Sequence, residues 1–85
     1  MAIIINDYQP SGEVVEVQFP GSKKRYEIPY ADDVITIEVQ EQFARGNYSE
    51  LLKHLPEDGQ KALKTLLKPA LEDFIEKWLG SSPGN

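Results

Sequence analysis

The sequence predicts one small α+β domain, in which an antiparallel β-hairpin or three-strand meander is followed by three to four short helices. Up to about residue 30, apolar residues alternate with polar ones, which is the period of a strand. Beyond it they recur every three or four residues, which is the period of a helix. The 85 residues, 40% of them hydrophobic, fit a single compact core. We expect the domain to cover residues 1–80, with a flexible tail over residues 81–85.

Two segments, residues 13–19 and 24–28, have the alternation of a hairpin. Between them, Pro20-Gly21 is the pair that a type II turn favours, because proline presets φ and glycine accepts a positive φ. Two registers stay open. One sets Val15 opposite Ile28 and thereby Glu16 opposite Glu27, and the other, slipped by two residues, avoids this like-charge pair.

The N-terminus carries the β-branched run Ile3-Ile4-Ile5, and residues 7–12 have the composition of a turn. Because an isolated two-stranded ribbon is marginal in water, we expect residues 2–6 to supply a third strand. The sequence leaves open whether residues 1–8 pair within the chain or with another copy. An exposed hairpin edge and a small domain are both compatible with a homo-oligomer.

Helix signals begin after residue 32. Thr36 is a good N-cap for a helix over about residues 37–45 that Gly46 ends, although the β-branched run 34–37 locally favours a strand. Ser49 heads a short segment that Pro56 ends, and a third helix is expected within residues 57–67.

The last predicted helix begins around Pro69, a residue favoured in a first helical turn, and ends at Gly80. Its broad apolar face is formed by Ala70, Leu71, Phe74, Ile75, Trp78 and Leu79.

Composition argues against several functions. The net charge of −5 disfavours binding to nucleic acid or to an anionic membrane surface. The absence of cysteine excludes disulfides, zinc–thiolate sites and thiol catalysis. No apolar run approaches a membrane span and no signal peptide is recognisable, so we expect a cytoplasmic protein.

Motifs for catalysis or metal binding are weak. His54 is the sole histidine, and it is predicted to be an ordinary surface residue. The turn Gly21–Lys24 lacks the order and the helix of a phosphate-binding loop, and Asp32-Asp33 with Glu38 lacks calcium-loop spacing. We therefore predict no catalytic residue, no metal, no cofactor and no enzyme activity, which leaves protein–protein binding by elimination.

Four segments give the chain a more specific character: Lys-Lys-Arg-Tyr-Glu-Ile-Pro-Tyr-Ala-Asp-Asp (23–33), Arg-Gly-Asn-Tyr (45–48), Leu-Leu-Lys-His-Leu-Pro-Glu-Asp (51–58) and Leu-Glu-Asp-Phe-Ile-Glu-Lys-Trp-Leu-Gly (71–80). In this order, and over residues 13–82, they resemble the small tail assembly chaperones of siphophages and prophages of actinobacteria. Residues 1–8 depart from that pattern.

The resemblance implies a non-enzymatic chaperone that binds the long, helical tape measure protein and keeps it soluble while the tail tube assembles. It also implies a longer product of programmed frameshifting, whose junction would fall in residues 81–85. The family carries no individual binding residue over to this sequence.

An unpartnered amphipathic coil needs an apolar groove to cover it. We expect the second to fourth helices to form this groove, with the partner-binding residues Leu52, Leu63, Leu67, Phe74 and Trp78 near it. For Phe74 and Trp78, packing in the core is the competing interpretation. The row Lys61, Lys64 and Lys68 is either a docking stripe for an acidic partner or a solvated face. The alternative function is a small acidic regulatory module, either antitoxin-like or a nucleic-acid mimic.

Overall fold

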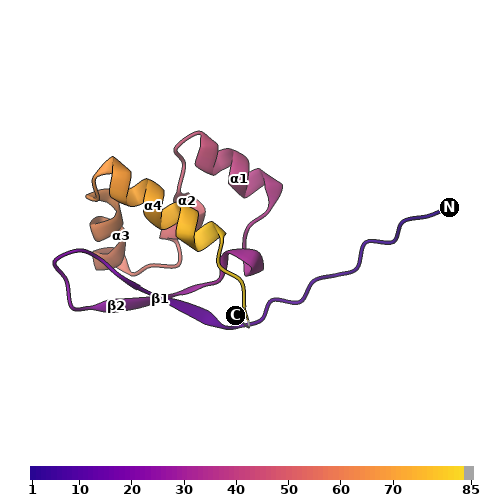
Figure 1. Cartoon of the computed structure of the whole chain (residues 1–85), viewed down its shortest axis with the longest axis horizontal. Helices are drawn as coiled ribbons and strands as arrows, with labels where there is room; N and C mark the ends of the chain where they lie inside the picture. The colour runs from indigo at the N-terminus through magenta and orange to yellow at the C-terminus, as the bar shows by residue number, and fades with distance from the viewer. Residues whose placement is uncertain (84–85) are drawn as a thin grey trace.

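The structure, a computed structural model, describes residues 1–83 and has the predicted α+β class. Strands β1 (Val14–Gln18) and β2 (Arg25–Pro29) form an antiparallel pair, and the 3-10 turn η1 (Ala31–Asp33) follows. The helices are α1 (Ile37–Ala44), α2 (Ser49–Leu52), α3 (Glu57–Lys64) and α4 (Lys68–Leu79). They cover one face of the strand pair, while the N-terminal residues run away from this body (Figure 1).

The hairpin has the first of the two predicted registers. Val15 lies opposite Ile28, and Glu16 lies opposite Glu27. The like-charge pair is offset by Arg25, whose Nη1 donates to Glu16 Oε2 at 3.1 Å on the exposed face. The predicted type II turn is also present. Gly21 has a φ of 75°, and Ser22 N donates a hydrogen bond across the turn to Phe19 O at 3.2 Å.

Of the two predicted sheet forms, the structure has the hairpin and not the three-strand meander. Residues 1–13 form no helix or strand. The physical reason is a tether that the sequence pattern does not reveal. Asp33 accepts hydrogen bonds from the Tyr8 hydroxyl at 3.1 Å, from the Ser11 amide at 3.2 Å and from the Ser11 hydroxyl at 2.6 Å. These bonds hold residues 8–11 against η1, so the expected turn back toward β1 does not form.

Helix α1 begins as predicted. The Thr36 hydroxyl accepts from Val39 N at 3.2 Å, and Gly46, with a φ of 82°, lies just beyond the helix end. The preceding β-branched residues form no strand, because Val34 N and Ile35 N both donate to Ala31 O and close η1 instead.

The body has one hydrophobic core beneath the helices. Its buried members are Val17, Phe19, Tyr26, Ile28, Ala31, Phe43, Leu51, Leu55, Leu63 and Trp78. Trp78 joins α4 to the sheet, because its Nε1 donates to Pro29 O at 2.9 Å. At the other end of the hairpin, Asp58 accepts from Lys24 Nζ at 2.6 Å and from the Tyr26 hydroxyl at 2.9 Å, which joins β2 to the start of α3.

Candidate protein-binding groove

An apolar groove separates α4 from β1 and the hairpin turn. It consists of three adjoining hollows of about 310, 200 and 270 Å³. The first two share Phe19, Pro20, Leu66 and Ala70, and the last two share Gln18 and Phe74. Because each hollow shares lining residues with the next, the three form one continuous depression, which we call the α4 groove.

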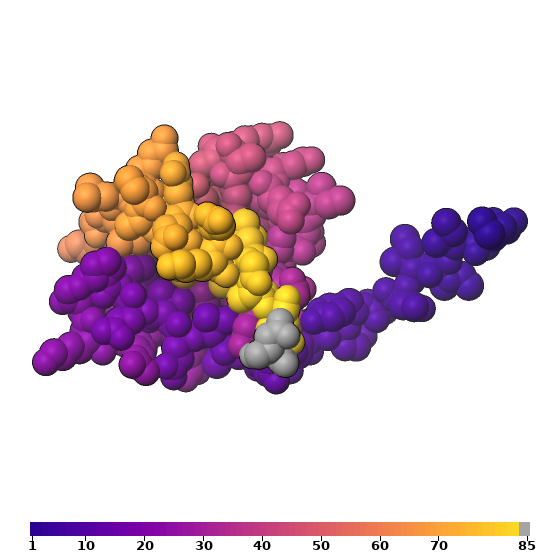
Figure 2. Space-filling model, viewed as in Figure 1, coloured from indigo at the N-terminus to yellow at the C-terminus, as the bar shows by residue number. Residues whose placement is uncertain are grey.

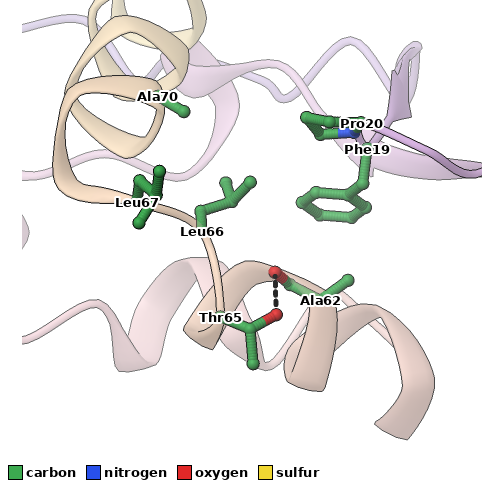
Figure 3. A pocket seen from close by; sticks show the side chains of 7 residues that line it. All are labelled: Phe19, Pro20, Ala62, Thr65, Leu66, Leu67 and Ala70. Carbon is green, nitrogen blue, oxygen red and sulfur yellow. Dashed lines mark hydrogen bonds between the residues drawn. The ribbon is translucent and has the colours of Figure 1, made fainter.

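The groove begins at the α3–α4 connection (Figure 3). This first part, the head hollow, is lined by Phe19, Pro20, Ala62, Thr65, Leu66, Leu67 and Ala70. Thr65 is its one lining residue with a polar side chain, and that hydroxyl donates within α3, at 3.0 Å to Lys61 O and 3.1 Å to Ala62 O. A hydroxyl engaged in this way leaves an apolar lining, which disfavours a polar ligand.

Leu67 is the most exposed large hydrophobic residue of this groove, at 79% of its full area. It is held there by the backbone, because it is the N-cap residue of α4 and Pro69 fixes the first turn that follows. An exposed leucine beside an apolar hollow offers about 1.5–3 kcal/mol of transfer free energy to a partner that covers it.

The five predicted partner-binding residues fall into two groups. Leu67 and Phe74 line the α4 groove, whereas Leu63 belongs to the core and Leu52 is half-buried against it. Trp78 is also buried, and it forms part of the floor of the third hollow. The core interpretation of Trp78 is therefore the one that the structure supports.

Sequence reasoning missed the hairpin contribution to the groove. Phe19 and Pro20 lie at the hairpin turn, far in sequence from Leu66 and Ala70, yet all four line the same hollows. The usable signal was Phe19 itself, an apolar residue that follows β1 in phase with the inward-facing Val17 and directly precedes the Pro20-Gly21 turn.

Two carboxylates of α4, beside the groove, lie close to lysines of the same helix. Lys68 Nζ lies 3.9 Å from Glu72 Oε1, and Lys77 Nζ lies 2.9 Å from Asp73 Oδ2. The hydrogen bond from Asp73 raises the pKa of Lys77 above its ordinary value. Two of the exposed carboxylates of α4 thus face lysines of the same helix. A nucleic-acid mimic needs a row of unopposed acidic groups, and these two carboxylates of α4 are not unopposed.

His54 does not have the exposed position predicted for it. The side chain is half-buried, and burial lowers the pKa of His54 below its ordinary value. Its Nε2 is enclosed and has no hydrogen-bond partner among residues 1–83. The prediction was wrong because the short α2 turns this residue toward the Pro10–Val14 segment and Val34, which line a hollow with it.

The other polar candidates form no reactive centre. Asp33 holds Tyr8 and Ser11, and the hydrogen bond from Ser11 lowers the pKa of the Asp33 carboxyl. Over residues 1–83, no group of three potential metal ligands comes together. Within the same range, no helix has the length and apolar character needed to cross a membrane.

No protein-family model, curated protein or solved structure matches the chain. The α4 groove and the motif order along the sequence are therefore the two grounds for assigning a function.

Proposed function

We propose that this protein is a non-enzymatic tail assembly chaperone that binds the tape measure protein and keeps it soluble in the cytoplasm during tail assembly. The observation that carries the proposal is the α4 groove, with Leu67 exposed at its head. The tape measure protein as partner is inferred from the motif resemblance, and the groove is an apolar surface on which an amphipathic helix of such a partner can bind.

The groove matches the chemistry of an amphipathic helix. Such a helix lays apolar side chains spaced by three, four and seven residues into an apolar groove on its partner. The head hollow and the adjoining hollow along α4 offer successive apolar positions, from Leu67 past Ala70 to Phe74. Lys61, Lys64 and Lys68 lie on the elements that meet at the head hollow, where they complement acidic residues that flank an apolar stripe.

The net charge supports the same role. A tape measure protein coated with copies that each carry a charge of −5 would repel other coated chains and remain dispersed. A chaperone must also be released when the tail tube subunits arrive, and an open groove with few polar contacts allows such release.

The test compares two substitutions during co-expression with a fragment of a tape measure protein. Leu67→Asp places a charge at the head hollow, while aspartate at an N-cap position maintains α4. Ile37→Asp is the matched control, because Ile37 is 76% exposed, also starts a helix, and lines no part of the α4 groove.

We expect Leu67→Asp to lose most of the soluble fragment and Ile37→Asp to retain the parent level. Circular dichroism checks that both variants keep the parent helix content. If folded Leu67→Asp solubilises the fragment as well as the parent does, the groove does not bind the tape measure protein.

A further inference from the structure

We propose that the N-terminal arm of one copy, residues 1–7, adds as a third strand to the free edge of β1 in a second copy. This inference concerns self-association and does not rest on the proposed function. It comes from three observations: the character of the arm, the tether at Asp33 and the shape of the groove beside β1.

The arm has the composition of a β-strand but is paired with no strand among residues 1–83. Ile3, Ile4 and Ile5 are 84%, 82% and 92% exposed. Consecutive β-branched residues favour extended backbone, and residues 1–6 carry no charged side chain to oppose pairing. Figure 2 shows the arm projecting from the body with no neighbouring segment beside it.

The tether directs the arm to another molecule. To pair with β1 of its own chain, the arm must reverse direction within residues 7–12. Tyr8 and Ser11 are instead bonded to Asp33, and Pro10 between them further restricts the backbone. The arm therefore leaves η1 heading away from its own β1 (Figure 1), and a sheet edge that it can reach belongs to a second copy.

The acceptor is the edge of β1 that does not pair with β2. The third hollow of the α4 groove is lined by all four residues from Val15 to Gln18, and by no residue of β2. Successive side chains of a strand point to opposite faces, so a hollow that touches four in a row lies along the strand edge. Within residues 1–83 that edge has no strand partner.

The hollow also provides apolar contacts for an added strand. Phe74 and Trp78 of α4 line it opposite β1. In an added strand, Ile3 and Ile5 share one face and Ile4 has the other, so one face of the arm can pack on the half-buried Phe74 ring while its backbone pairs with β1. The other end of the groove, at Leu67, stays open.

The first test measures mass against concentration, by light scattering and sedimentation equilibrium, on the full chain alone. We expect the mass to rise above that of the 9.6 kDa monomer as concentration increases. The double variant Ile3→Pro/Ile4→Pro removes backbone donors on both edges of the arm, one of which must face β1, and should weaken association about tenfold or more. Ile37→Pro is the matched control, since proline is favoured in a first helical turn, and it should associate like the parent.

A parent chain that stays monomeric at every concentration overturns the proposal. So does an Ile3→Pro/Ile4→Pro variant that associates as strongly as the parent. If the arm becomes protected from proteolysis only when a tape measure fragment is added, its occupant is that partner and the second copy is excluded.

The second test locates the acceptor edge by disulfide formation, which is clean because the chain has no cysteine. Ile4→Cys protein is mixed with Glu16→Cys or with Glu27→Cys protein, two positions that lie directly opposite each other on β1 and β2. Mass spectrometry of the mixed dimers should find about tenfold more cross-linking to position 16, because a disulfide requires Cα atoms within about 7 Å and β2 lies one strand further from the arm. Equal yields, or a higher yield at position 27, contradict the assignment to β1.

Discussion

The body and the N-terminal arm place isoleucine in opposite surroundings. Ile28 of β2 is completely buried in the core, whereas Ile4 of the arm is 82% exposed. Their side chains have the same intrinsic hydrophobicity, and both stand in β-prone segments. What differs is the surroundings: β2 has a paired strand and a layer of helices over it, while the arm is led away from both by the tether at Asp33. Hydrophobicity alone therefore does not tell a folding residue from a binding residue.

The largest expected effect is a direct test of this comparison. Ile28→Ala should lower the free energy of unfolding by about 2–5 kcal/mol, because it leaves a cavity in the core. A domain of this size has a total of about 4–13 kcal/mol, so this one substitution removes a large share of the stability. Ile4→Ala should change stability by less than about 0.5 kcal/mol.

Urea denaturation followed by tryptophan fluorescence measures both, because the one tryptophan is the buried Trp78. The measurement is made at low concentration, where association does not contribute to stability. A loss at Ile4 similar to that at Ile28 would mean that the arm packs on its own body.

Periodicity and cap chemistry predicted the body well. Thr36, Gly46, Pro69 and the Pro20-Gly21 turn all act locally, and each has its predicted role. The register could be narrowed to two candidates only, because alternation fixes which face is apolar but not which pairs meet. The cross-strand bond from Arg25 to Glu16 removes the charge penalty that kept the second register open.

The arm and the groove were harder to predict for a shared reason. The tether joins Asp33 to residues 22 and 25 positions earlier, and no local pattern records such a contact. Helical periodicity likewise predicts one apolar face for α4, but not which of its residues are buried in the core and which line the groove. Trp78 in the core and Phe74 in the groove therefore have the same pattern in the sequence. Leu67 was found because it follows the stripe of α3, although its exposure depends on the α4 boundary.

A smaller effect is expected from His54, in the pH dependence of stability. Burial lowers the pKa of His54 in the folded state, with Glu50 opposing this shift and Lys53 adding to it. As the pH falls below about 6.5, the unfolded chain takes up a proton that the folded chain resists, so stability decreases until the lower folded pKa is reached. Solvent screening at a half-buried ring keeps the loss below about 1 kcal/mol.

His54→Gln should remove this loss between about pH 6.5 and the folded pKa, and leave a second loss of stability at lower pH unchanged. That second loss belongs to Asp33 and Asp58, whose folded pKa values are lowered by their hydrogen bonds, and it begins below about pH 4. Denaturation midpoints measured across the pH range separate the two windows. If His54→Gln has the same midpoint profile as the parent above pH 5, the histidine does not control this step.

The smallest effect on stability, and the sharpest on the arm, is expected from Asp33→Asn. The carboxylate accepts three hydrogen bonds with two oxygens, and an amide has only one acceptor oxygen. These bonds are exposed, so the free energy of unfolding should change very little. The Asp33 bond raises the pKa of the Tyr8 hydroxyl, so this pKa should fall back toward its ordinary value in the variant. A proton NMR titration of the Tyr8 ring measures it, with Asp32→Asn as the control that keeps the tether. A Tyr8 titration unchanged by Asp33→Asn would show that the arm is not held at η1. The proposal that the arm pairs with a second copy would then lose the tether on which it is argued.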